Sequence, residues 1–410
     1  MHERTQRRIC RVVYVLVSIV PTVLAVAFVL YFHRPWQERD WQQRLENNLH
    51  VRASVSQVTA PRPGGRDLYD IRLADLSSRK KIASIDKLQL LSDGSVHSGQ
   101  VELTFQELNE LARIVQNWFG ADEPASADFT ADRLLLSRGE DEVCVLTNVQ
   151  LSIDGATTQN RKLSFQANLN TEQSRQACVR IQGERDTAGY WDVFLDCREC
   201  QIPAWYFTDF LPGATRWNNA RFGGTVRLHC ENNNVEGSLE GTFTSVDLQT
   251  WLGEDSPHKL RGTANLQLDK CSWVNHRVVE VQGSLKSEPG QIGHSLISAL
   301  ANSPYCELGK SFTGSLSDEI LSFEKLACSF SLNAAGLTVT GNCLAPSPEM
   351  AGCLLISDSR PLLVQPTCPH VPLPYFVQVF CPLEKYWLPG MRRAVDLAEL
   401  LPEPEHAIKK

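Results

Sequence analysis

Two cysteines separated by two residues form the first pattern in this chain that could carry chemistry, the sequence Cys197-Arg198-Glu199-Cys200. A structural zinc site needs a second pair of ligands, and a thioredoxin-like redox site needs the pair at the start of a helix in an α/β unit. Neither context surrounds this motif, which follows a strand-like run and precedes Pro203. The pattern therefore favours a disulfide or two unlinked thiols over a metal site or redox chemistry.

Two histidines lie near cysteines in the sequence and could suggest a metal site. His229 precedes Cys230, and His276 follows Cys271. Both histidines fall on the polar faces of expected strands, and neither brings the four ligands that close a structural zinc site. We interpret them as solvated side chains.

Motifs with a known catalytic mechanism are absent from the sequence. There is no G-x-S-x-G elbow, no H-E-x-x-H helix, no EF-hand loop and no G-x-G-x-x-G turn. Gly309-Lys310-Ser311 ends like a phosphate-binding loop, but Pro304 occupies the position of that motif's first glycine. We therefore predict a non-enzymatic protein without catalytic, cofactor-binding or metal-binding residues.

An aromatic cluster follows Pro203 and consists of Trp205, Tyr206, Phe207, Phe210 and Leu211. Such a cluster can touch a membrane or a partner protein. More often it caps the open end of a β core, because large rings bury much apolar surface there. We favour capping.

The elements that would position these residues are mainly strands, since apolar and polar residues alternate along most of the chain. In the clearest stretch, Leu260 to Asp269, one face carries Leu260, Gly262, Ala264, Leu266 and Leu268. Further strands are predicted around Tyr69–Leu73, Val149–Ile153, Leu163–Leu169, Val226–Cys230, Val235–Phe243, Val279–Leu285, Leu326–Leu332 and Leu337–Cys343. Short turns such as Asn232-Asn233-Asn234 separate neighbouring strands, which predicts an antiparallel meander. Glycines at inward positions, such as Gly237 and Gly283, would ease curvature of the sheet.

Few helices are expected beside these strands. The first begins at a capping box formed by Thr104 and Glu107 and ends at Gly120. A second is predicted around His294 to Ala301, and a third from Arg392 to Leu401. The segment from Pro346 to Pro389 is rich in proline and is expected to be irregular.

The segment from Val12 to Phe32 contains no charged residue and matches the hydrocarbon thickness of a bilayer. Four arginines precede it, which by the positive-inside rule places the N-terminus in the cytoplasm and the rest of the chain across the membrane. A cleaved signal peptide ending near Ala25-Val26-Ala27 is the alternative. Because the apolar run continues from Phe28 to Phe32, we favour an uncleaved anchor. Trp36 and Trp41 would then suit the far interface.

Composition excludes a nucleic-acid-binding function. The formal net charge of the 410 residues is -7 and the pI about 5.8, whereas phosphate binding requires a basic face. Apolar and charged fractions of 42% and 21% are those of a chain that folds. Twelve of the thirteen cysteines follow the apolar segment, which permits disulfides without fixing their pairing.

These signals predict a mainly β protein: a single N-terminal transmembrane helix followed by curled antiparallel β-sheets, groove-like or sandwich, with a few short helices. The predicted division is a cytoplasmic N-terminus at 1–11, a transmembrane helix at 12–32, a stalk at 33–48, a strand-rich extracytoplasmic domain at 49–345, and a proline-rich C-terminal segment and tail at 346–410.

The order of these features resembles the AsmA-like family of bacterial envelope proteins, relatives of the bridge-like lipid-transfer proteins. The resemblance rests on the span Val12 to Phe32, the segment Leu68 to Leu91, the stretch Leu260 to Leu300, and Phe323 to Leu326 followed by Leu337 to Gly341. It departs from the family in its many cysteines and in the proline-rich stretch after Pro346. The resemblance implies the bacterial inner membrane, a periplasmic β domain and an apolar interior that receives lipids.

Two functions follow as hypotheses. In the first, the membrane-anchored protein handles membrane lipids or takes part in envelope assembly. In the second, it is a structural or interaction scaffold whose β domain is a closed sandwich that binds an envelope protein. An elongated apolar surface would favour the first, and a filled core the second.

Overall fold

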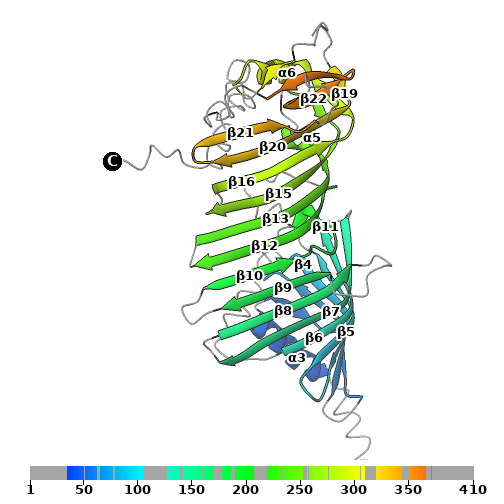
Figure 1. The fold of residues 1–410 in the computed structure, drawn as a ribbon. Helices are drawn as coiled ribbons and strands as arrows, with labels where there is room; N and C mark the ends of the chain where they lie inside the picture. Colours follow the sequence, from blue (N-terminus) through cyan, green and yellow to red (C-terminus); the bar gives the residue numbers. More distant parts are fainter. Residues whose placement is uncertain are drawn as a thin grey trace, which may run out of the picture. The chain divides into compact units, whose positions relative to one another are not determined.

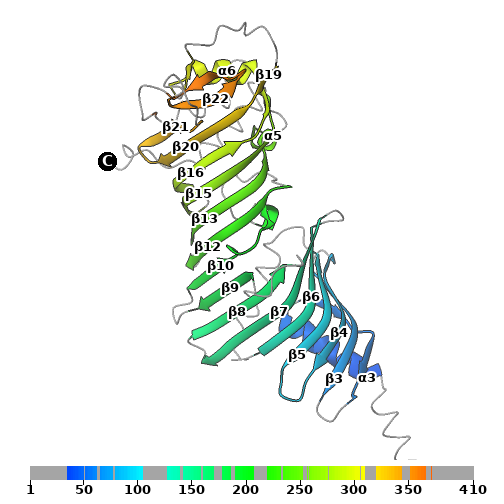
Figure 2. The same ribbon diagram turned by 45° about the vertical axis from the view of Figure 1, so that its right-hand side comes forward.

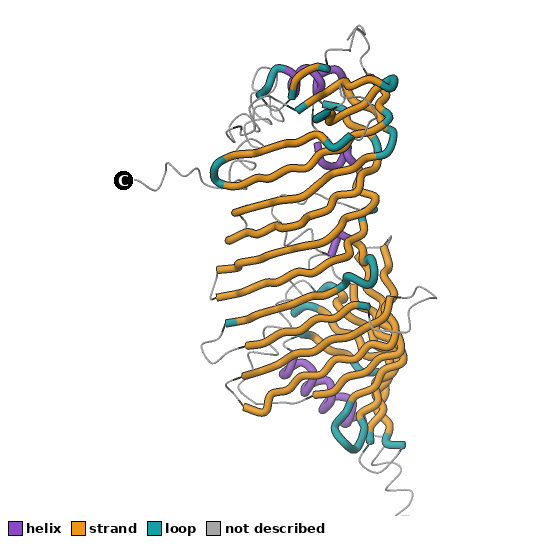
Figure 3. Tube along the Cα trace, in the orientation of Figure 1, coloured by secondary structure: helices purple, strands orange, loops and turns teal. Residues whose placement is uncertain are grey.

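The computed structural model describes residues 35–49, 51–61, 65–76, 79–104, 127–138, 142–157, 160–169, 178–185, 190–206, 219–231, 234–252, 256, 258–275, 277–304, 306–309, 320–343, 351–365 and 371. Strands dominate these residues, as Figure 3 shows in orange. The predicted mainly β class is therefore confirmed. The chain divides into two compact units, residues 1–154 and 155–410, so the predicted domain at 49–345 spans parts of both.

The predicted transmembrane segment, Val12 to Phe32, lies outside the described residues. Within the part of the chain that the structure describes, no helix combines the length and apolar character that a membrane span requires.

Unit 1 consists of one described helix and seven strands (Figure 1). They are α3 (Pro35–Leu49), β1 (Arg52–Ser54), β2 (Gln57–Thr59), β3 (Arg66–Ala74), β4 (Lys81–Leu90), β5 (Val96–Thr104), β6 (Ala127–Arg138) and β7 (Glu142–Thr157). Strands β1 and β2 both pair with β3, and β4 to β7 follow in chain order.

One pairing in unit 1 departs from the predicted antiparallel meander. Strands β5 and β6 run parallel, with Val96 opposite Phe129 and Thr104 opposite Ser137. A parallel pair needs a crossover connection of a dozen residues or more. The 22 residues between the two strands, 105–126, supply that length, and the helix predicted from Thr104 to Gly120 falls on them, outside the described residues.

The core of unit 1 lies between its sheet and helix α3. Leu68 and Ile71 on β3 are 0% and 1% exposed, and Trp41 and Leu45 of α3 pack against their cluster. Asp70, at φ 49°, stands between Leu68 and Ile71 and allows both to join one cluster. The segment predicted as a stalk is therefore a helix on the sheet, and Trp41 contributes to a protein core.

Unit 2 contains a long antiparallel series of strands, seen in chain order in Figure 2. They are β8 (Asn160–Leu169), β9 (Val179–Arg185), β10 (Trp191–Asp196), β12 (Arg221–Glu231), β13 (Asn234–Asp247), β15 (Thr263–Val274), β16 (Arg277–Ser287), β20 (Lys325–Asn333) and β21 (Gly336–Gly341). Each pairs with the next along this series.

Shorter elements complete unit 2. Strand β11 (Ile202–Pro203) pairs with β12, and η2 (Ala204–Tyr206) follows it. Strands β14 (Leu260–Arg261), β17 (Gly290–Gly293) and β19 (Ile320–Phe323) form a separate sheet. Helix α5 (Leu248–Leu252) contacts β14, and α6 (His294–Ala301) contacts β17 and β18 (Glu307–Leu308). Helix α6 confirms the prediction over the same residues.

The predicted strand from Leu260 to Asp269 is divided between the two sheets. Leu260 and Arg261 pair with β17, whereas β15 begins at Thr263 and pairs with β13 and β16. Gly262 between them has φ +140°, a backbone conformation that residues with a Cβ rarely adopt. The predicted alternation of buried residues is confirmed, but this glycine lets the chain change sheets.

The proline-rich C-terminal segment is not entirely irregular, contrary to the prediction. It contains β22 (Cys353–Ser357) and β23 (Arg360–Val364), which form a hairpin. Asp358 and Ser359 at its turn both have positive φ, as the mirror-image turns of tight hairpins require. The run Leu354, Leu355 and Ile356 is buried. Burial of these apolar residues therefore stabilises a strand despite the prolines nearby in the sequence. The predicted helix from Arg392 to Leu401 lies outside the described residues.

Candidate functional site

The nine-strand series of unit 2 carries a continuous row of apolar side chains. Residues directly opposite one another on paired strands share a face of the sheet. Register joins one residue from each strand into a single row: Phe165, Ile181, Leu195, Val226, Leu239, Cys271, Val281, Leu332 and Leu337. We call the face that bears this row the apolar face, and the opposite side the polar face.

A second row on the apolar face runs beside the first. It consists of Leu163, Gly183, Val193, Leu228, Gly237, Trp273 and Val278. At a strand spacing of 4.8 Å, nine strands span about 38 Å, more than the roughly 15 Å that half a bilayer's hydrocarbon core measures. The apolar face is therefore wide enough to accommodate an acyl chain lying across the strands.

Burial on the apolar face is uneven. Leu239 and Cys271 are buried, at 1% and 7% exposed. Phe165, Ile181 and Leu195, at the β8 side of the row, are only half-buried. Since an apolar side chain gains about 25 cal/mol per Å² removed from water, the half-buried members retain area from which a ligand could displace water.

Trp273 fills the middle of the apolar face above a glycine. A Cβ placed on Gly237 would lie 2.0 Å from Cζ2 of Trp273, so the indole rests directly on the glycine backbone. Trp273 is 2% exposed. The sequence predicted that Gly237 eases curvature of the sheet, and this stays a prediction; the structure shows that Gly237 makes room for the Trp273 ring.

Two arginines occupy the end of the apolar face on β8 and β9. Arg161 lies opposite Arg185, which lies opposite Trp191. Arg161 is 7% exposed, and the guanidinium carbon of Arg185 lies 5.6 Å from the centroid of the Trp191 ring. The sequence does not single out this pair, although extending the alternation of Leu163 and Phe165 back by two residues reaches Arg161.

The polar face has a hollow of about 640 Å³ over β9 to β16. Asp192 Oδ1 and His229 Nδ1 lie 2.7 Å apart at its edge. The hydrogen bond with Asp192 raises the pKa of His229 above its ordinary value. Ser238 and Ser272 also line the hollow, but among the described residues no hydrogen bond links either hydroxyl to His229, as an activated nucleophile would require.

A β-bulge brings an apolar residue to this hollow. Glu280 lies opposite Ser272, and Val278 lies opposite Trp273, so Val279 is an extra residue on β16. Val279 is 47% exposed and Val274 is 37% exposed, and both line the hollow. Period-two alternation along the predicted strand Val279–Leu285 places Val279 on the same inward face as Val281. The prediction was wrong because the bulge reverses the alternation at this residue.

The cysteines described by the structure carry free thiols. Burial raises the pKa of the Cys197 thiol to about 12, and Cys197 is 0% exposed. Cys200 is half-buried, and its sulfur donates to the carbonyl of Cys178 at 3.3 Å. The motif at Cys197 to Cys200 thus takes the form of two unlinked thiols. Cys368 and Cys381 lie outside the described residues.

The remaining residues that the sequence singled out are two histidines, the aromatic cluster and the segment Gly309 to Ser311. His229 lies on the polar face, and His276 lies outside the described residues. Among the described residues, no three His, Cys, Asp or Glu side chains gather as a metal site requires. Trp205 is 2% exposed, which agrees with capping, and the cluster from Phe207 onward is not described. Gly309 follows β18, whereas Lys310 and Ser311 are also outside the described part.

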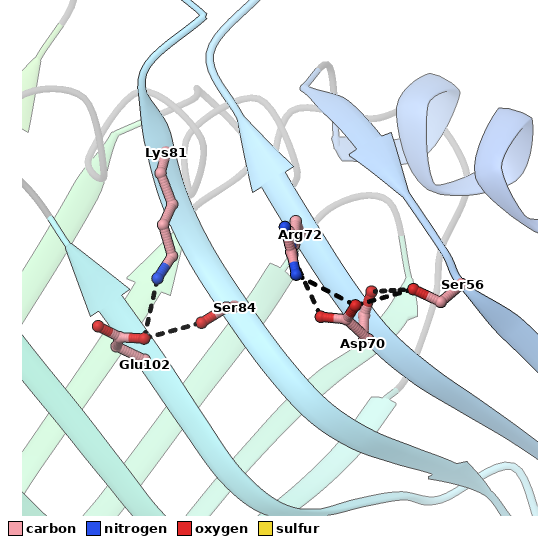
Figure 4. A network of polar contacts seen from close by, with 6 residues as sticks. All are labelled: Ser56, Asp70, Arg72, Lys81, Ser84 and Glu102. Carbon is pink, nitrogen blue, oxygen red and sulfur yellow. Dashed lines mark hydrogen bonds and ion pairs between the residues drawn. The ribbon is translucent and has the colours of Figure 1, made fainter.

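Unit 1 has a network of charged side chains on β3 to β5 (Figure 4). Asp70 accepts hydrogen bonds from Ser56 Oγ at 2.9 Å and from Arg72 at 3.2 Å. These two partners hold the pKa of Asp70 below its ordinary value. Glu102 accepts from Lys81 at 2.9 Å and Ser84 at 2.8 Å, and its pKa is lowered for the same reason. Carboxylates held ionised in this way are suited to fixing strands, not to donating protons.

Comparison with protein-family models, curated proteins and solved structures returned no match.

Proposed function

We propose that this protein is a membrane-anchored envelope protein that handles lipids, and that unit 2 binds acyl chains on its apolar face. The observation that carries the proposal is the row of nine apolar residues, one from each of nine successive strands. A sheet face of this width must be covered by another apolar surface. Lipid chains are the apolar surface that a protein beside a membrane meets most often.

The cellular setting belongs to the same proposal. The uncharged segment Val12 to Phe32 anchors the chain in the bacterial inner membrane, and the residues after it lie in the periplasm. The similarity to AsmA-like proteins supports this setting through the order of the anchor and the strand series. We assign no catalytic role to any residue.

Binding of a fluorescent fatty acid tests the proposal. The full chain, delipidated and held in an amphipathic polymer, should bind the probe saturably. Leu228→Asp, on the apolar face of β12, should weaken binding at least tenfold. Ser238→Asp, half-buried on the polar face of the neighbouring strand β13 and opposite Arg227, is the matched control and should bind as the parent does. Absence of saturable binding, or equal loss in both variants, would overturn the proposal.

An interaction scaffold is the second candidate, and exposed Val274 and Val279 in the polar hollow favour it. Isolated apolar residues within a polar rim are typical of protein contact sites. In this case a photoreactive residue at Val279 would crosslink to one envelope protein in native membranes. Crosslinks to many proteins in proportion to their abundance would contradict a specific partner.

A further inference from the structure

We infer that Cys343 and Cys353 are a site of disulfide formation, and that the bond fastens hairpin β22–β23 to the end of the nine-strand series. In the structure both residues carry free thiols. Cys343 lies two residues beyond the end of β21, and Cys353 is the first residue of β22. This modification is separate from acyl-chain binding, because neither residue belongs to the apolar row.

The backbone holds the two cysteines at the separation that a disulfide needs. The amide of Cys343 donates a hydrogen bond to the carbonyl of Cys353 at 3.0 Å. Residues that share such a bond between neighbouring strands have Cα atoms about 5–6 Å apart. Disulfides join Cα atoms that are usually about 4.4–6.8 Å apart. The bond can therefore form without a large movement of the backbone.

Both side chains point into one small core. Cys343 is 4% exposed and Cys353 is 0% exposed, and they share a cluster with Ala327 and Ile356. Two cysteines whose Cβ atoms point apart cannot be joined unless the backbone moves. Since both side chains belong to the same cluster, this obstacle is absent here.

The two sulfurs lie against the same segment of β22. Cys343 Sγ is 3.2 Å from the carbonyl oxygen of Leu354. Cys353 Sγ is 3.3 Å from the carbonyl oxygen of Leu355, the next residue. Hydrogen bonding from the Cys353 thiol also lowers the pKa of Cys343 below its ordinary value. Because a thiolate is the species that attacks a disulfide, Cys343 is the better nucleophile of the two.

A disulfide oxidant accepts the electrons in this reaction. The Cys343 thiolate attacks one sulfur of the oxidant's disulfide, and the other sulfur leaves as a thiolate that takes up the proton lost by Cys343. The Cys353 thiolate then attacks the Cys343 sulfur, and the oxidant's second sulfur leaves and takes up the proton lost by Cys353. Two electrons and two protons thus pass to the oxidant. Oxidants of this class act in the periplasm, where the proposed anchor would place both cysteines.

Peptide mass spectrometry of the full chain in an amphipathic polymer tests the inference. The reduced chain is incubated with oxidised glutathione in urea just below the unfolding midpoint of unit 2, so that the buried thiols become accessible through transient opening. Remaining thiols are then blocked with N-ethylmaleimide. The peptides of Cys343 and Cys353 should be recovered joined and lighter by two hydrogen atoms. Closing the loop between them should lower the unfolding equilibrium constant of unit 2 about a hundredfold.

Variants assign the bond to this pair. C343S and C353S should each remove the joined peptide and the stabilisation that oxidation brings. C328S is the matched control and should keep both, because Cys328 is a half-buried thiol on the neighbouring strand β20, opposite Gly341. Circular dichroism checks that each variant is folded.

Two results with the parent chain would overturn the inference. In one, Cys343 and Cys353 are both blocked after treatment with glutathione. In the other, either residue is joined mainly to a different cysteine, such as Cys328.

Blocking thiols in intact cells before lysis separates this inference from the proposed function. A joined pair in cells would support both the disulfide and the periplasmic setting. A pair that glutathione joins in the purified chain but that is blocked in cells would overturn the periplasmic setting and leave this inference intact.

Discussion

The two units use similar strands but treat their apolar side chains differently. In unit 1, helix α3 packs on the sheet, and Leu68 and Ile71 are almost fully buried. In unit 2, the row through Phe165 and Leu195 is half-buried at its β8 side. Unit 1 therefore buries its apolar side chains between sheet and helix, as an ordinary protein core does. Unit 2 instead has an apolar face that keeps water-accessible area at its β8 side.

The largest expected difference between the units concerns truncation of a leucine. Leu68→Ala removes a side chain that is 0% exposed and should cost about 2–5 kcal/mol of unit 1 stability. Leu228→Ala removes a half-buried one and should cost about 1 kcal/mol of unit 2 stability. Urea unfolding followed by hydrogen exchange of peptides from each unit measures both. Equal losses would show that the apolar face is as fully buried as the core of unit 1.

Alkaline pH should weaken unit 2 through its buried thiols. Burial raises the pKa of Cys197 and Cys306 to about 12 and that of Cys271 to about 11. The folded state thus holds protons that the unfolded state releases near pH 9, so this stability is complete below pH 9 and is lost as pH rises. Each thiol should cost about 1 kcal/mol between pH 9 and 10.

The same urea experiment at pH 8, 9 and 10 checks this expectation. Cys271→Ala should reduce the loss of unit 2 unfolding free energy between pH 9 and 10 by the contribution of one thiol, about 1 kcal/mol. An unchanged slope in that variant would show that other groups cause the loss.

Glycine substitutions should also distinguish the units. A Cβ at Gly237 would overlap the Trp273 ring, so Gly237→Ala should destabilise unit 2 by about 1–3 kcal/mol. On β5 of unit 1, a Cβ at Gly99 would have no atom within 4 Å. Gly99→Ala is the matched control and should be neutral or stabilising by under about 1 kcal/mol. Tryptophan fluorescence would report movement of Trp273 in the first variant.

The smallest effect is expected on the polar face of unit 2. Asp192→Asn removes the hydrogen-bond partner that raises the pKa of His229, so that pKa should fall. The pair stabilises the fold only where His229 is charged, at low pH, and this contribution disappears as pH rises through the raised pKa. Because both side chains are exposed, stability should hardly change. Titration of the imidazole by NMR measures the shift, and an unchanged pKa would contradict the assigned cause.

Period-two alternation predicted the strands and the faces of unit 2 because register preserves which residues point to each side. It failed where local backbone geometry interrupts the period, at Gly262 between two sheets and at the Val279 bulge. Contacts between distant segments were also beyond its reach. The parallel pairing of β5 with β6 and the packing of Trp41 on unit 1 depend on tertiary structure.

The candidate site shows the same limit. Alternation predicted most strands of the apolar row one by one. The order and register in which the strands pair cannot be read from the sequence, so the row itself could not be predicted. Arg161 and Arg185 are 24 positions apart and become neighbours only through the register of β8 with β9.

Photocrosslinking at two adjacent positions tests the central claim most directly. Photoreactive p-benzoylphenylalanine is placed at Leu228, on the apolar face, or at Arg227, its neighbour on the polar face of β12. After irradiation of native membranes, mass spectrometry of the purified full chain should find lipid adducts at position 228 and none at position 227. Equal lipid adducts at both positions, or protein adducts alone at position 228, would contradict acyl-chain binding on the apolar face.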